Sequence, residues 1–132
     1  MILPNVDDTI NNERAKELCE YFGYTHLVER INTNPNSYKE WVFDGASMIV
    51  DKEFSEMHHI PNLVEIALKH DLKYAYGESG NTAEKLQADK DFQGDLINDG
   101  ASPTTAKFMF KMVDKFGKEE YKTPFSWTFA KK

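Results

Sequence analysis

The sequence contains a single cysteine, Cys19, among its 132 residues, so no disulfide can form within the chain. Cys19 stands at helical spacing with Ala15, Leu18 and Phe22, which predicts a core residue rather than a nucleophile. No apolar run approaches the roughly 20 residues that span a bilayer. The first eight residues also lack the basic start and long apolar stretch of a secretory signal. We therefore expect a protein of the reducing cytoplasm.

Positive charge is also scarce, because 16 Lys and Arg residues stand against 22 Asp and Glu residues, a formal net charge of −6. This balance argues against binding to a phosphate backbone, so no nucleic-acid partner is expected. Surface acidity is compatible with holding a cation but predicts no metal site by itself. The length suits one compact domain with a real core, and the sequence contains no linker, repeat or low-complexity tract. We expect a single domain over residues 1–132.

Helical periodicity is the most frequent pattern along the chain, and cap residues bound most of the periodic segments. β-leaning segments at residues 24–31 and 38–43, separated by the turn formers of residues 32–37, predict a hairpin across residues 24–43. The aromatic tail, residues 121–129, is expected to be extended and packed on its own core. The predicted class is α+β, mainly α, with helices at residues 11–22, from 61 to the glycine at 77, 81–98 and 102–117.

Two residues that can do chemistry lie on one face of the predicted helix that begins near Pro61. His70 and Tyr74 are four residues apart, so an imidazole and a phenol sit one above the other on the face turned toward the protein. Asp71 points about 100° away, toward the flank of that face. The segment thus places a carboxylate beside a buried imidazole.

The next predicted helix carries an acid at a core-facing position, Asp89, between Leu86 and Phe92. A buried carboxylate is costly unless it has hydrogen-bond donors. Two antiparallel helices joined by a short loop would bring Asp89 opposite His70 and Tyr74, whose N–H and O–H groups are such donors. A carboxylate placed in this way fixes the imidazole tautomer and leaves the second ring nitrogen for water.

A simpler interpretation stays open for each residue. His70 would be a core histidine satisfied by one hydrogen bond, with Asp71 exposed to solvent. Asp89 would rotate outward and form a surface ion pair with Lys85 or Lys90.

The segment His70-Asp71-x-x-Tyr74 resembles the H-D-x-x-Y signature on the first long helix of phospholipases A₂. Residues 88–92 resemble the A-D-x-x-F segment on the second helix of the disulfide-free viral members, and this likeness covers roughly residues 61–98. The chain also resembles a small, largely phage-borne family of unknown function. That likeness rests on the D-G-A-S element at residues 44–47, the H-D and A-D-x-x-F helices and the F-G pair at residues 116–117. It covers roughly residues 40–130.

The phospholipase resemblance implies an antiparallel two-helix core and a role for each matching residue. His70 would be the general base that deprotonates a water, with Asp89 and Tyr74 fixing its ring. Asp71 would hold a calcium ion, which takes six to eight oxygen ligands and would polarise the ester carbonyl. Further ligands are expected from the loop at residues 44–47, namely Asp44 and Gly45. The implied function is calcium-dependent hydrolysis of a lipid or related ester, with no other cofactor.

Two other functions remain possible. Residues 67–72 resemble the A-x-L-H-D-I helix of HD-type metal-dependent phosphohydrolases, and His58 and His59 could supply a further ligand for a transition metal. These histidines lie only 11 to 12 residues before His70, with Pro61 between, too near for the separate helix of that family. The chain could also be a non-catalytic phage or prophage accessory protein that binds a partner through this scaffold. The sequence leaves the oligomeric state open.

Overall fold

The computed structural model describes residues 1–45 and 59–132, and within these ranges it forms five α-helices and one two-stranded antiparallel sheet. None of the helices in these ranges is long and apolar enough to cross a membrane. The prediction of a mainly helical α+β fold is confirmed at this level. Ala46, Ser47 and His58, which the sequence analysis named, lie outside the described residues. The elements are β1 (Thr9–Ile10), α1 (Asn12–Phe22), α2 (Thr25–Thr33), η1 (Pro35–Ser37), β2 (Trp41–Val42), α4 (Leu63–Ala75), α5 (Thr82–Asn98), α6 (Pro103–Phe116) and η2 (Glu119–Tyr121).

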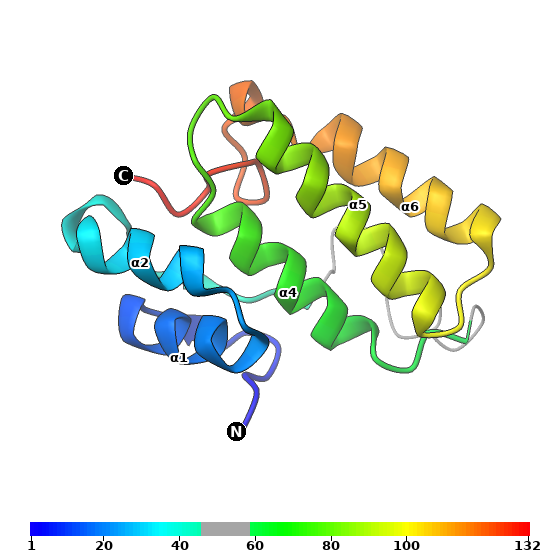
Figure 1. Cartoon of the computed structure of the whole chain (residues 1–132), viewed down its shortest axis with the longest axis horizontal. Coiled ribbons are helices and arrows are strands. Elements are labelled where there is room, and N and C mark those ends of the chain that lie inside the picture. Colours follow the sequence, from blue (N-terminus) through cyan, green and yellow to red (C-terminus); the bar gives the residue numbers. More distant parts are fainter. Residues whose placement is uncertain (46–58) are drawn as a thin grey trace.

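Helices α4, α5 and α6 lie side by side in an up-down-up arrangement, with α5 between the other two (Figure 1). Polar caps begin two of these helices. The Asn81 side chain accepts a hydrogen bond from the N–H of Glu84 at 2.9 Å, and the Ser102 hydroxyl accepts one from the N–H of Thr105 at 3.1 Å. Short connections between capped helices make neighbours antiparallel, so the predicted antiparallel arrangement of α4 and α5 is confirmed.

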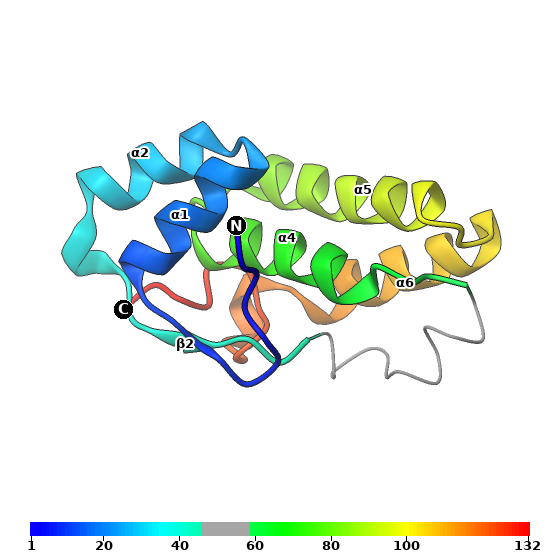
Figure 2. The ribbon, with the colours of Figure 1, turned by 90° about the horizontal axis from the view of Figure 1, so that it is seen from below.

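Helices α1 and α2 pack against each other, and α1 contacts α4, as Figures 1 and 2 show from two directions. The prediction of a hairpin across residues 24–43 is wrong, because residues 25–33 form α2. Its buried residues Leu27 and Ile31 are four apart, a spacing that suits one helix face as well as the loose alternation of a strand. His26 is therefore exposed on a helix rather than on a strand. Strand β2 pairs with β1 instead, with Ile10 opposite Trp41.

The core has two main parts that meet on α4. One part joins α1, α2 and the sheet to one side of α4, and includes Cys19 and Leu72. The other joins α4 to α5 and α6, and includes Ile66, Phe92 and Met109. Helix α4 therefore has apolar partners on two sides, which explains why eight of its 13 residues are buried.

The tail folds back onto this core, as the sequence predicted, although through turns rather than as an extended strand. Trp127 is 2% exposed and packs its ring edge-on against Tyr74, with ring centroids 5.1 Å apart. The backbone N–H of Thr128 donates to the carbonyl of Tyr74 at 2.8 Å, and the Trp127 indole N–H donates to the carbonyl of Glu78 at 2.8 Å. The tail thus braces the C-terminal end of α4.

Candidate functional site

Helix α4 presents an imidazole and a phenol toward α5, as its periodicity predicts. His70 and Tyr74 are 8% and 2% exposed, and their ring centroids are 4.2 Å apart. The ring of Phe92, on α5, lies 4.7 Å from the imidazole centroid. Two aromatic rings thus limit the positions that the imidazole can take.

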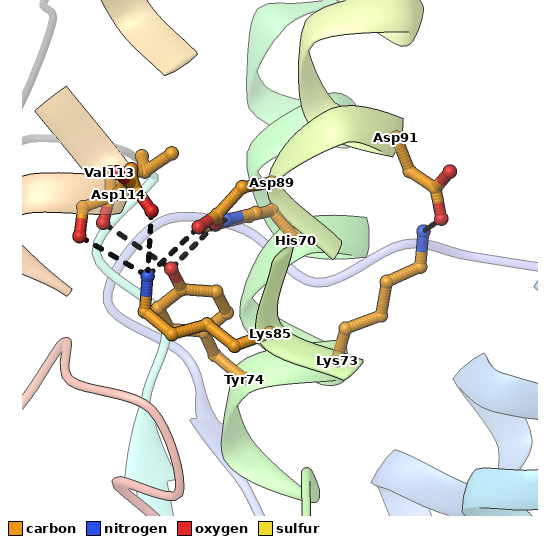
Figure 3. Close-up of polar contacts among 8 residues, drawn as sticks. All are labelled: His70, Lys73, Tyr74, Lys85, Asp89, Asp91, Val113 and Asp114. Atoms are coloured by element: carbon orange, nitrogen blue, oxygen red, sulfur yellow. Dashed lines mark hydrogen bonds and ion pairs between the residues drawn. The ribbon is translucent and has the colours of Figure 1, made fainter. Parts of the chain in front are cut away.

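Asp89, on α5, joins these two side chains. It has no solvent exposure, and its Oδ1 atom lies 2.9 Å from Nε2 of His70 and 2.6 Å from the Tyr74 hydroxyl (Figure 3). The Tyr74 hydroxyl also lies 3.3 Å from the backbone carbonyl oxygen of Val113. All hydrogen bonds between the His70 ring and the described residues are made through Nε2. The three side chains that the sequence analysis expected to meet are therefore in contact.

The fourth member of this cluster is Lys85, which the sequence analysis named only as a possible surface partner of an outward-facing Asp89; that outward orientation is wrong, because Asp89 is fully buried. The ammonium group of Lys85 lies 2.9 Å from Oδ2 of Asp89, and Lys85 is only 9% exposed. It also donates to the backbone carbonyl of Asp114 at 3.2 Å and lies 3.6 Å from a carboxylate oxygen of that residue. Leu86, expected on the buried stripe of α5, is 40% exposed instead. The i, i+4 spacing of Lys85 and Asp89 indicates the pair, whereas its burial depends on the contacts with α4 and α6.

The surroundings of the two rings shift their pKa values in ways that suit a neutral imidazole and a protonated phenol. Burial lowers the pKa of His70, and the hydrogen bond and negative charge of Asp89 offset only part of that effect. His70 is therefore neutral at pH 7. Burial, followed by the negative charge of Asp89, raises the pKa of Tyr74 far above its ordinary value. The phenol thus remains a hydrogen-bond donor throughout the physiological range.

Asp71 lies next to His70 on α4 and is partly buried. Burial raises the pKa of Asp71 well above its ordinary value of 3.8, and the negative charge of Asp44 raises it further. The negative charge of Asp44 therefore acts on the carboxyl group of Asp71. The resemblance assigns both residues to one calcium site. Gly45 follows at a positive φ of 67°, a conformation that favours glycine. Asp71 is partly buried and Asp44 is exposed, and carboxylate oxygens of this kind are ligands that a hard cation takes.

No group of three His, Cys, Asp or Glu side chains that could hold a metal ion occurs within residues 1–45 and 59–132. From the described part of the chain, an ion held by Asp71 and Asp44 would take its further ligands from other oxygens, such as backbone carbonyls. His59 is exposed and belongs to no such group with His70 and Asp71. The described residues thus give no support to an imidazole-rich transition-metal site.

Two ion pairs connect α4 to α5 on the other side of the cluster. Lys73 lies 3.0 Å from a carboxylate oxygen of Asp91, and Lys69 lies 3.4 Å from one of Asp95 (Figure 3 shows the first). Both pairs are partly exposed, so each adds little stability. They favour the same register of the two helices that sets His70 opposite Asp89.

Comparison with known proteins identifies no relative: no protein-family model, no curated protein and no solved structure matches the chain.

Proposed function

We propose that the protein is a hydrolase similar to phospholipases A₂, in which His70 activates a water for attack on the ester of a lipid or a related molecule. The observation that supports this proposal best is the hydrogen-bonded arrangement of three side chains. Oδ1 of Asp89 lies 2.9 Å from Nε2 of His70 and accepts a hydrogen bond from the hydroxyl of Tyr74 at 2.6 Å. This arrangement orients a neutral imidazole by a buried carboxylate, which is how a general base is held in its working tautomer.

The side chains of this chain would share the work as follows. Nε2 of His70 is committed to Asp89, so Nδ1 takes the proton of the attacking water. The negative charge of Asp89 then stabilises the imidazolium, and Tyr74 keeps that carboxylate in place. His70 next gives the proton to the leaving alkoxide, which returns the ring to its neutral form.

Asp71, with Asp44 and Gly45, would hold the calcium ion that the resemblance implies. The fit rests on the carboxyl group of Asp71, because burial and then the negative charge of Asp44 raise its pKa, and a bound cation would favour its ionised form. When bound, calcium would polarise the ester carbonyl and stabilise the oxyanion. The chain contributes to this by placing Asp71 directly after the base on α4.

A hydrolysis assay with phospholipid vesicles and a soluble carboxylic ester tests the proposal. His70→Asn keeps a hydrogen-bond donor for Asp89 but removes the base. We expect its rate to fall by about 10²- to 10⁴-fold, the usual contribution of a general base. His26→Asn, at an exposed histidine on α2, is the matched control and should keep full activity.

Two results would contradict the proposal. Hydrolysis that persists in folded His70→Asn would show that His70 is not the base. Absence of hydrolysis in the wild-type protein with either substrate, in the presence of calcium, would favour a non-catalytic accessory protein on this scaffold.

A further inference from the structure

The buried carboxylate of Asp89 contacts polar atoms of three side chains, but only one of these side chains carries a positive charge. The Tyr74 hydroxyl donates to Oδ1 and Nε2 of the neutral His70 ring lies 2.9 Å from the same atom, whereas the ammonium group of Lys85 lies 2.9 Å from Oδ2. A carboxylate with no solvent exposure needs a charged partner or must take up a proton. Within the described residues, Lys85 is the cation that contacts Asp89.

The charge state of Asp89 determines which nitrogen of the imidazole carries the proton. An ionised carboxylate can only accept, so the neutral His70 ring must carry its proton on Nε2 and leave a lone pair on Nδ1. A protonated Asp89 could instead donate to Nε2, and the ring would then carry its proton on Nδ1. A ring of the second kind has no free lone pair for a water, so it cannot act as a base.

We infer that Lys85 is a positioning residue: its ammonium group holds Asp89 in the acceptor-only form and thereby keeps the proton of His70 on Nε2. The catalytic consequence of this assignment rests on the proposed function, whereas the tautomer itself does not. Lys85 is well held for such a role, because its ammonium group also donates to the backbone carbonyl of Asp114 and lies 5.6 Å from the centre of the Tyr74 ring. Lys85 lies on α5 one turn before Asp89, so the two charged groups lie on the same side of one helix.

Lys85 also lines a pocket of about 580 Å³ between the N-terminal part of α5 and the C-terminal end of α6. The residues around this pocket also include Thr82, Asp114, Lys118, Glu119, Glu120 and Trp127. The pocket offers small molecules a route to the position of the ammonium group. A shortened side chain at position 85 could therefore be complemented by an amine added to the solution.

The experiment uses the whole protein and reads the tautomer of His70 from its ring ¹⁵N resonances at about pH 8, where the neutral ring prevails. The wild-type protein should show the proton on Nε2. Lys85→Ala should shift the population toward the form protonated on Nδ1, and n-propylammonium, which replaces the missing part of the lysine, should restore the original spectrum. 1-Propanol, of similar size but without charge, should not restore it.

Activity gives a second reading. Lys85→Ala should lower the hydrolysis rate by about 100-fold, near the lower end of the contribution of a general base. Propylammonium or the substitution Lys85→Arg should recover most of the lost rate. Lys90→Ala, at an exposed lysine of the same helix, is the matched control and should change neither tautomer nor rate.

The possible results separate the two proposals. A wild-type ring protonated on Nδ1 would overturn the role of Lys85, and this reading needs no variant to fold. An unchanged tautomer in folded Lys85→Ala, or equal rescue by 1-propanol, would overturn it as well. Absence of hydrolysis in the wild-type protein would contradict the proposed function alone, and the spectra would still decide the role of Lys85.

Discussion

At the scale of single residues, a carboxylate without solvent exposure defines the candidate site. Asp89 uses both oxygens, one toward His70 and Tyr74 and the other toward Lys85. Replacing a buried ion pair by apolar residues is often neutral or stabilising, so such a pair is weak evidence for a purely structural role. Its value to this protein is better explained by the fixed orientation that it gives to the imidazole.

The ionised form of Asp71 would bind a calcium ion, but the folded protein without a cation disfavours that form. The pKa of Asp71 is raised in the folded protein, first by burial and then by the charge of Asp44. A raised pKa means that its contribution to stability is complete below about pH 3.8, the ordinary value, and is lost as the pH rises through the folded value. At neutral pH without calcium, Asp71→Asn should therefore melt at a higher temperature than the wild-type protein.

Calcium should reverse this order. A ligand that binds only the folded state adds about 2.7 kcal/mol of stability at a hundredfold excess over its dissociation constant. Thermal unfolding in EDTA, calcium or manganese measures this for both proteins. A calcium-specific increase that is absent from Asp71→Asn supports the calcium site. An equal increase in both proteins would exclude Asp71 as a ligand, and a preference for manganese would favour the phosphohydrolase alternative.

At the scale of elements, the close approach of the α6 C-terminus to α4 supports the position of Tyr74. Gly117 ends α6, and a Cβ atom at this position would lie 2.5 Å from the backbone carbonyl oxygen of Val113 and 2.7 Å from both the hydroxyl oxygen and Cε2 of Tyr74. The backbone carbonyl of Gly117 also accepts a hydrogen bond from the N–H of Trp127 at 2.9 Å. Absence of a side chain here allows the end of α6, the tail and the phenol to meet.

Gly117→Ala should therefore displace the end of α6 or Tyr74 and destabilise the protein by about 1–3 kcal/mol, the usual cost of overpacking. Gly94→Ala, within α5, is the matched control because a Cβ atom there meets nothing within 4 Å. It should stabilise the protein by up to about 1 kcal/mol through its higher helix propensity. Urea unfolding of both variants measures the two effects. Equal stabilities of Gly117→Ala and the wild-type protein would show that Tyr74 is not confined by α6.

At the scale of the whole molecule, the two main parts of the core meet on α4, and the candidate site lies on the side of α4 that faces α5. Cys19 lies in the part of the core that contains α1 and α2, and it is fully buried. Burial, together with a smaller effect of Glu20, raises the pKa of the Cys19 thiol to about 12. The thiolate, which is the reactive form, is therefore rare in the folded protein.

Reaction of Cys19 with a disulfide reagent at about pH 8 should follow opening of this half of the core. We expect labelling of the native protein to be about 10³-fold slower, or more, than labelling in denaturant, since folded domains open rarely. A Lys90→Cys substitution in a Cys19→Ala background gives an exposed thiol as the control, and it should react rapidly in both conditions. Fast labelling of native Cys19 would show that the packing of α1 against α4 is loose.

Local patterns determined the larger helices and three members of the candidate cluster. Residues 70 and 74 are one turn apart, and the Asn81 and Ser102 caps define where α5 and α6 begin, because helix geometry and capping act over a few residues. These signals indicate core-facing positions for His70, Tyr74 and Asp89, but the inward orientation of Asp89 was settled only by the packing of α5 against α4.

The tertiary structure alone decided the features that depend on competition between distant partners. Residues 25–33 became a helix because Leu27 and Ile31 pack into the core beside α1, whereas their spacing fits a strand nearly as well. Lys85 turned inward and Leu86 outward because the ammonium group finds Asp89 and the α6 carbonyl of Asp114. Hydrophobicity alone would bury Leu86 and expose Lys85. The buried charge of Asp89 on the same helix reverses this preference.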